Sequence, residues 1–211
     1  MNNLFNKIFM WLGIGLLLSF GTAFLTSQNI NLVMNVFGKF YIWLVIIEFG
    51  LAFVLGLFVR KLSKEMLTVL YIAYCIVTGF TLSSIFIMYQ ISSIVLIFLI
   101  TGLVFAALSF YGYKTNKDIT KIGTILFFGL IAIILATIVN IFLKSSKMDI
   151  IVTIISILIF IGYIAYDTHL IKNKLYGIDD DKLVIYGAFQ FYLDFINLFL
   201  DLLRLFGKGK D

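Results

Sequence analysis

Long runs of apolar residues recur along this 211-residue chain, and they constrain its fold more than any other feature. A helix needs about 20 such residues to cross the hydrocarbon of a bilayer. Backbone groups in lipid find no water, so each run must satisfy its own hydrogen bonds as a helix. We therefore predict an all-α polytopic membrane protein, one domain over residues 1–211, with seven transmembrane helices near residues 8–27, 40–59, 67–88, 92–113, 121–143, 149–170 and 184–206.

The composition excludes several other classes of protein. Hydrophobic residues make up 62% of the sequence and charged residues 13%, an apolar surplus that one soluble core could not bury. The run after Lys7 is longer than the apolar part of a secretory signal peptide, so we expect a retained helix. With one cysteine, Cys75, and one histidine, His169, neither a disulfide framework nor a zinc centre is expected. The lipid bilayer is the expected partner, nucleic acid is not, and we expect no cofactor.

The distribution of basic residues predicts the orientation of the helices. Lysines and arginines gather in the loops after the second, fourth and sixth predicted helices, and such loops stay on the cytoplasmic side. Together with a composition rich in lysine, isoleucine and asparagine, this favours a bacterial inner (plasma) membrane and a cytoplasmic N-terminus. Seven full crossings would place Arg204, Lys208 and Lys210 outside. The last helix therefore either crosses against the charge rule or re-enters the membrane.

The last predicted helix carries a polar stripe. Its spacings of four, three, four and three residues place five side chains within about an 80° arc at ~100° per residue; these are Gln190, Asp194, Asn197, Asp201 and Arg204. An aspartate at the centre of a membrane helix costs about 2.5–3.5 kcal/mol, so such residues face a bundle interior or a water-filled cavity. The stripe predicts a hydrated ion pathway. The alternatives are a buried structural hydrogen-bond network and a helix that lies in the membrane interface.

Asp167, near the end of the sixth predicted helix, is the candidate partner of Asp194. Two carboxyls within a few ångströms in low dielectric cannot both ionise at low cost, and they would titrate as a unit. By helical rise, Asp167 lies roughly 7 Å and Asp194 roughly 18 Å from the nearest basic loop residues. The pair therefore meets only if the last helix begins within the membrane or is steeply tilted. Otherwise Asp167 is an interfacial carboxylate that pairs with Lys172.

Two more ionisable residues belong to the second predicted helix, Glu48 near its middle and Arg60 at its end. Arg60 is either a positively charged membrane anchor or a cationic partner of Asp167. Glu48 needs a buried partner, and Arg204 is the cation that we expect to reach it. Comparison of the double variant with the two single variants would test that pairing.

Four segments resemble the Bax inhibitor-1 (transmembrane Bax inhibitor motif) family, in a bacterial form. The resemblance covers essentially the whole chain, and its segments are Thr78-Gly79-Phe80-Thr81-Leu82-Ser83, Tyr111-Gly112-Tyr113-Lys114-Thr115-Asn116-Lys117-Asp118, Ile164-Ala165-Tyr166-Asp167-Thr168 and Tyr192-Leu193-Asp194-Phe195-Ile196-Asn197-Leu198-Phe199. It implies a seven-helix bundle with the last helix at the centre, and a pH-sensitive calcium leak.

The resemblance also assigns roles to individual residues. The two pH-sensing aspartates of the family match Asp167 and Asp194, and an arginine that engages them matches Arg60. A family glutamate and a late arginine match Glu48 and Arg204. The sequence departs from the family pattern at Ser84, where many members carry proline. That departure puts the kink expected in the third helix in doubt.

Together these observations predict a pH-sensitive calcium leak channel and not an enzyme. Calcium prefers hard oxygen ligands, and it would be the permeant ion or an ion bound at the aspartates. The gate is Asp167, Asp194 and Arg60, and the pathway residues are Glu48, Asn197, Asp201 and Arg204. The alternatives are a proton-coupled transporter and a non-conducting regulatory membrane protein. An intramembrane aspartyl protease is disfavoured, since Asp194 lacks the flanking glycines of such enzymes.

Overall fold

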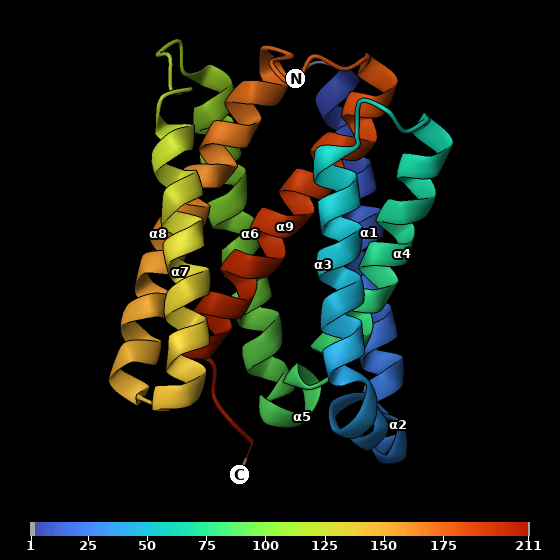
Figure 1. The fold of residues 1–211 in the computed structure, drawn as a ribbon, viewed down its shortest axis with the longest axis vertical. Helices are drawn as coiled ribbons and strands as arrows, with labels where there is room; N and C mark the ends of the chain where they lie inside the picture. The colour runs from blue at the N-terminus through green and yellow to red at the C-terminus, as the bar shows by residue number, and fades with distance from the viewer. Residues whose placement is uncertain (1–2, 211) are drawn as a thin grey trace. The chain divides into compact units, whose positions relative to one another are not determined.

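A computed structural model describes residues 3–210 of the chain, and its long elements are all helices (Figure 1). In chain order they are α1 (Asn3–Ser27), α2 (Ile30–Asn35), the π-helical turn η1 (Val36–Phe40), α3 (Tyr41–Leu57), α4 (Lys64–Leu82), α5 (Ile85–Met88), α6 (Ile91–Lys114), α7 (Ile122–Leu143), α8 (Ser146–Lys172) and α9 (Asp180–Phe206). Within residues 3–210, seven helical spans are long and apolar enough to cross a membrane, which confirms the predicted all-α polytopic class.

Capping side chains explain where two of the spans begin earlier than predicted. The second span runs over Ile30–Leu57, because the side chain of Asn29 accepts hydrogen bonds from the amides of Asn31 and Leu32 and so starts α2. In the same way Asp179 accepts from the amide of Lys182, 2.9 Å away, and α9 starts at Asp180 rather than near residue 184. Hydropathy does not register such polar helix starts.

The third span is interrupted although it contains no proline. Helix α4 ends at Leu82 and α5 begins at Ile85. The hydroxyl of Ser83 donates to the carbonyl of Phe80 at 2.7 Å, and that of Ser84 donates to the carbonyl of Thr81 at 3.3 Å. Serine side chains that compete in this way for backbone acceptors loosen a helix. The break is therefore present, and two serines accompany it where many family members carry proline.

The chain forms two compact units. The first comprises Met1–Ile91, Tyr176–Tyr192 and Gly209–Asp211, and the second comprises Ser92–Leu175 and Leu193–Lys208. Helix α9 contributes its first half to one unit and its second half to the other. Of its apolar stretch 78% is buried, against 44% or less in each of the other six spans that the structure describes, so α9 is the most buried span.

In the first unit, α1 and α3 both pack against α4 (Figure 1). Gly79 of α4 lies so close to α1 that an added Cβ would be 2.6 Å from Cβ of Thr22 and 2.7 Å from the carbonyl oxygen of Ser19. The small residue thus permits the close helix contact. The hydroxyls of Ser19 and Tyr192 form a buried hydrogen bond that ties α1 to the first half of α9.

In the second unit, α7 packs against α8, and α6 approaches α8 closely at Gly112. The second half of α9 contacts α6 through Phe195, whose ring centroid lies 5.2 Å from that of Phe98 and 5.8 Å from that of Phe105. These aromatic contacts fix the rotation of α9 about its axis within this unit.

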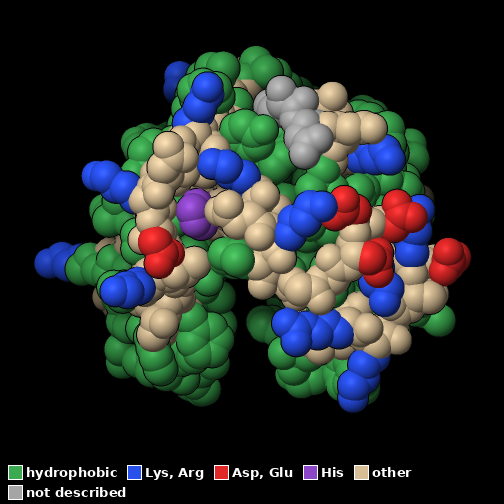
Figure 2. All heavy atoms as spheres, turned by 90° about the horizontal axis from the view of Figure 1, so that it is seen from above, with side chains coloured by type: hydrophobic (Ala, Val, Ile, Leu, Met, Phe, Trp, Pro, Cys, Tyr) green, Lys and Arg blue, Asp and Glu red, His purple; other side chains and the backbone are tan. Residues whose placement is uncertain are grey.

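Large hydrophobic side chains are exposed along the spans, as a lipid-facing surface requires. Leu17, Leu103 and Phe142 have exposed fractions of 76%, 73% and 82%. By contrast, the view onto the helix ends in Figure 2 shows Lys, Arg, Asp and Glu side chains gathered among uncharged ones. Apolar sides and charged ends are the surface pattern of a membrane-spanning protein.

Candidate functional site: a buried carboxyl pair

The structure brings Asp167 and Asp194 together in the second unit. Asp167 lies in α8 and Asp194 in the second half of α9, with exposed fractions of 3% and 4%. The charge of Asp167 acts on the Asp194 carboxyl, and the Tyr163 side chain, one turn before Asp167, feels both charges. The predicted pair is therefore a cluster of two carboxyls and a phenol on two neighbouring helices.

The slope of α9 allows the two aspartates to meet despite their different distances from the helix ends. Figure 1 shows the second half of α9, in red, crossing α6 obliquely. This is the steep tilt that the sequence requires for a pair. The Lys172 ammonium donates to the carbonyl of Thr115 at 3.3 Å. The alternative pairing of Asp167 with Lys172 stays a prediction.

The environment of Asp194 makes its proton chemically important. Its Oδ2 atom is buried and has no hydrogen-bond partner among the described residues. A buried carboxylate oxygen without a donor is expensive, and a second carboxyl nearby adds repulsion when both are charged. Gain of one proton by the pair would remove the repulsion, which is why two such carboxyls are expected to titrate together.

The polar stripe continues along α9 and meets α8. The carboxyl of Asp201 lies near the hydroxyl of Ser156 and near the charged side chains of Arg204 and Asp149. Arg204 Nη1 lies 3.9 Å from Asp149 Oδ1, an ion pair of half-exposed side chains. Sequence reasoning missed Asp149, although its position in the first turn of α8 is a signal for a charged partner at a helix end.

Asn197, between the two aspartates of the stripe, directs its side-chain NH₂ toward its own helix. That group donates to the carbonyl of Leu193 at 2.7 Å, which uses one of its two N–H donors. The half-buried Asn197 thus offers its amide oxygen and its second N–H to the stripe.

Glu48 and Arg60 both belong to the first unit. Half-buried Glu48 accepts a hydrogen bond from the hydroxyl of Thr81, at 2.8 Å. The sequence did not predict this partner, although Thr81 lies in the first of the four segments that resemble the family. Exposed Arg60 donates to the carbonyl of Tyr176 at 3.2 Å, next to Gly177 with its positive φ of 65°. The pairing of Glu48 with Arg204 and that of Arg60 with the aspartates stay predictions.

The described residues contain no group of three or more His, Cys, Asp or Glu side chains arranged to hold a metal ion. Calcium takes six to eight oxygen ligands, and two carboxyls supply only part of such a shell. The calcium contact expected at Asp167 and Asp194 stays a prediction.

Seven apolar spans and a pair of buried carboxyls on two of them define the class: a polytopic helical membrane protein with acidic groups buried among its helices. The chain belongs to the family described as inhibitor of apoptosis-promoting Bax1, whose model matches residues 1–211. The family expected from the sequence motifs is thereby confirmed.

Three relatives illustrate the similarity. The chain is 41% identical to inner membrane protein YbhL of Escherichia coli (strain K12), over 97% of this chain and 91% of the relative. It is 37% identical to an uncharacterized protein of Borreliella burgdorferi, over 100% of this chain and 94% of the relative. It is 34% identical to an uncharacterized membrane protein of Streptococcus pyogenes serotype M1, over 99% of this chain and 94% of the relative.

Proposed function

We propose that this protein is a pH-sensitive leak channel for calcium in a bacterial inner membrane, with a cytoplasmic N-terminus, and that Asp167 and Asp194 gate it. The observation that carries the proposal is the interaction of two buried carboxyls on membrane-spanning helices. Ionisable residues at such positions usually belong to ion or proton pathways. Membership of the family and the similarity to inner membrane protein YbhL support the membrane assignment.

The chemistry of the gate follows from the charge of the pair. Deprotonated, the two carboxylates attract cations and repel each other; protonated, they do neither. Two helix arrangements that differ in the separation of Asp167 and Asp194 would therefore change in relative population with pH. Asn197 and Asp201 extend the oxygen-lined route along α9. Arg60, Glu48 and Arg204 are the further gate and pathway residues of this proposal, and no enzymatic step is required.

Calcium flux from vesicles tests this function. We expect purified wild-type protein to release calcium at a rate that changes roughly tenfold between mildly acid and mildly alkaline pH, a coupling of ordinary size. Asp167→Asn and Asp194→Asn each leave a single titrating carboxyl, so the pH response should largely disappear. Vesicles that carry either variant and keep the wild-type rates at every pH would overturn the proposal.

Asp118 provides a matched control for that experiment. This exposed carboxylate follows α6 in a loop, where the hydroxyl and then the amide of Thr120 donate to it and hold its pKa below the usual range. It therefore stays ionised across the assay. Asp118→Asn removes one carboxylate outside the pair, and we expect its calcium flux to keep the full pH response.

A further inference from the structure

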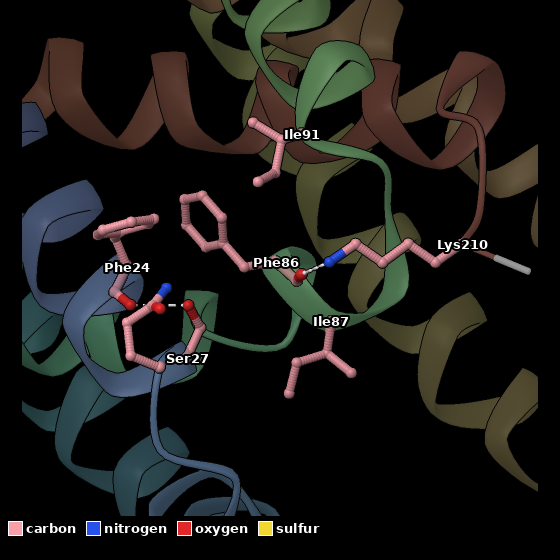
Figure 3. A pocket seen from close by; sticks show the side chains of 7 residues that line it. Phe24, Ser27, Phe86, Ile87, Ile91 and Lys210 are labelled. Atoms are coloured by element: carbon pink, nitrogen blue, oxygen red, sulfur yellow. Dashed lines mark hydrogen bonds between the residues drawn. The ribbon is translucent and has the colours of Figure 1, made fainter.

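The first unit contains a pocket of about 360 Å³ that the proposed channel function does not use (Figure 3). Its apolar walls are side chains from α1, α5 and the start of α6, namely Phe24, Phe86, Ile87 and Ile91. Its polar lining is Ser27, Gln28 and Lys210. The pocket thus combines a hydrophobic wall with a small group of polar atoms, as ligand sites commonly do.

Two hydrogen bonds to the backbone of the C-terminal tail hold the tail at this pocket. The amide of Lys210 donates to the carbonyl of Met88 at 2.9 Å, and Nε2 of Gln90 donates to the carbonyl of Gly209 at 3.1 Å. These two bonds join the tail to the turn between α5 and α6. The position of Lys210 in the pocket wall therefore does not depend on its flexible side chain alone.

The ammonium of Lys210 can donate further hydrogen bonds to a ligand. Figure 3 shows the lysine side chain directed toward Phe86, whose carbonyl oxygen accepts from Nζ at 2.7 Å. An ammonium has three N–H donors, and this bond uses one. Among residues 3–210, Lys210 is the only charged residue that lines the pocket, and the lining from this range includes no carboxylate. The pocket is consequently an electropositive site that suits an anion.

The pocket lies where three membrane spans end. Ser27 is the last residue of α1, Ile87 is next to the last residue of α5, and Ile91 is the first residue of α6. Span ends lie at the level of the lipid headgroups. The side chains of Ile87 and Ile91 have exposed fractions of 37% and 54%, so an apolar surface leads away from the pocket.

We propose that this pocket binds the phosphate of an anionic phospholipid from the surrounding bilayer. Lys210 supplies the cation, Gln28 supplies amide donors, and the acyl chains run over Ile87 and Ile91. Basic residues at the ends of membrane helices attract anionic lipids, and an ammonium binds phosphate as a compact point charge. A lipid fits this pocket better than free phosphate does, because the pocket has an apolar wall and lies at the ends of membrane spans.

Native mass spectrometry of the full chain in neutral detergent tests the proposal. We expect phosphatidylglycerol to bind more tightly than phosphatidylcholine with the same acyl chains. Lys210→Gln should weaken phosphatidylglycerol binding about fivefold, the effect of one basic residue near an anionic headgroup, and Lys210→Arg should retain most of it. Lys208→Gln removes the same charge two residues earlier, outside the pocket lining, and should change binding little. Equal losses in the two glutamine variants would overturn the assignment.

A second comparison separates lipid from free anion. Ile91→Trp fills the pocket without any change of charge, and it should weaken phosphatidylglycerol binding while the helical circular dichroism signal stays unchanged. Millimolar inorganic phosphate should not displace the lipid from the wild-type protein. Complete displacement by phosphate, or full lipid binding by Ile91→Trp, would overturn the proposal.

Discussion

At the scale of single residues, the chain places polar groups in apolar surroundings and then satisfies most of them locally. Buried Ser19 donates to the carbonyl of Cys75 at 2.7 Å and shares a hydrogen bond with the hydroxyl of the fully buried Tyr192. Asp194 differs, since its Oδ2 atom has no hydrogen-bond partner among residues 3–210. A satisfied polar group serves structure, whereas an unsatisfied buried carboxyl points to function.

The bond between Ser19 and Tyr192 gives a prediction of unequal effects. Tyr192→Phe removes a hydroxyl and leaves Ser19 with its carbonyl acceptors, so it should lower the free energy of unfolding by about 0.5–1.5 kcal/mol. Ser19→Ala leaves the buried Tyr192 hydroxyl without that partner and should lower it by about 1–3 kcal/mol. Reversible unfolding in mixed micelles measures both. If the tyrosine variant proved the less stable of the two, this view of the bond would be wrong.

At the scale of elements, glycine positions decide how closely the helices approach. A Cβ added at Gly112 of α6 would lie 2.9 Å from Cβ of Thr168 and 3.0 Å from Cα of Ala165, and closer still to the Ala165 carbonyl oxygen. Backbone atoms of α8 cannot move aside as a side-chain end can. At Gly102 of the same helix, an added Cβ would meet nothing within 4 Å.

These two glycines form a matched pair for mutation. Gly112→Ala should lower the free energy of unfolding by about 1–3 kcal/mol, because it overpacks the contact of α6 with α8. Gly102→Ala should be neutral or slightly stabilising, since alanine favours helix more than glycine does. The same micelle unfolding measurement applies. Equal effects of the two substitutions would show that the contact at Gly112 is not tight.

Hydropathy was sufficient to predict the seven helices because the lipid requirement for a long apolar helix is strong. It was insufficient where polar side chains act on the backbone. The start of α2 depends on Asn29 as a cap, and the break after α4 accompanies the hydroxyls of Ser83 and Ser84. Neither hydrogen-bonding pattern changes an average of hydropathy. In addition, the serine at position 84, where many family members carry proline, had put the break in doubt.

At the scale of the whole molecule, α9 carries most of the candidate site. Periodicity predicted its polar stripe, and the structure places Asp194 and Asp201 of that stripe among buried residues. The partners of the stripe on α8 were only partly predictable, since they depend on how two distant segments pack. Asp167 was predicted from its position in an apolar run and from the family motif. Asp149 and its contact with Arg204 became evident only from the structure.

The central claim is that Asp167 and Asp194 titrate as one unit, and infrared spectroscopy tests it most directly. The carbonyl band of protonated carboxyls can be followed with pH in the wild-type protein, in Asp167→Asn and in Asp194→Asn. Interaction between the two groups predicts that the remaining aspartate of each variant titrates over a different pH range from the wild-type pair. A wild-type titration equal to the sum of those of the two single variants would contradict the account.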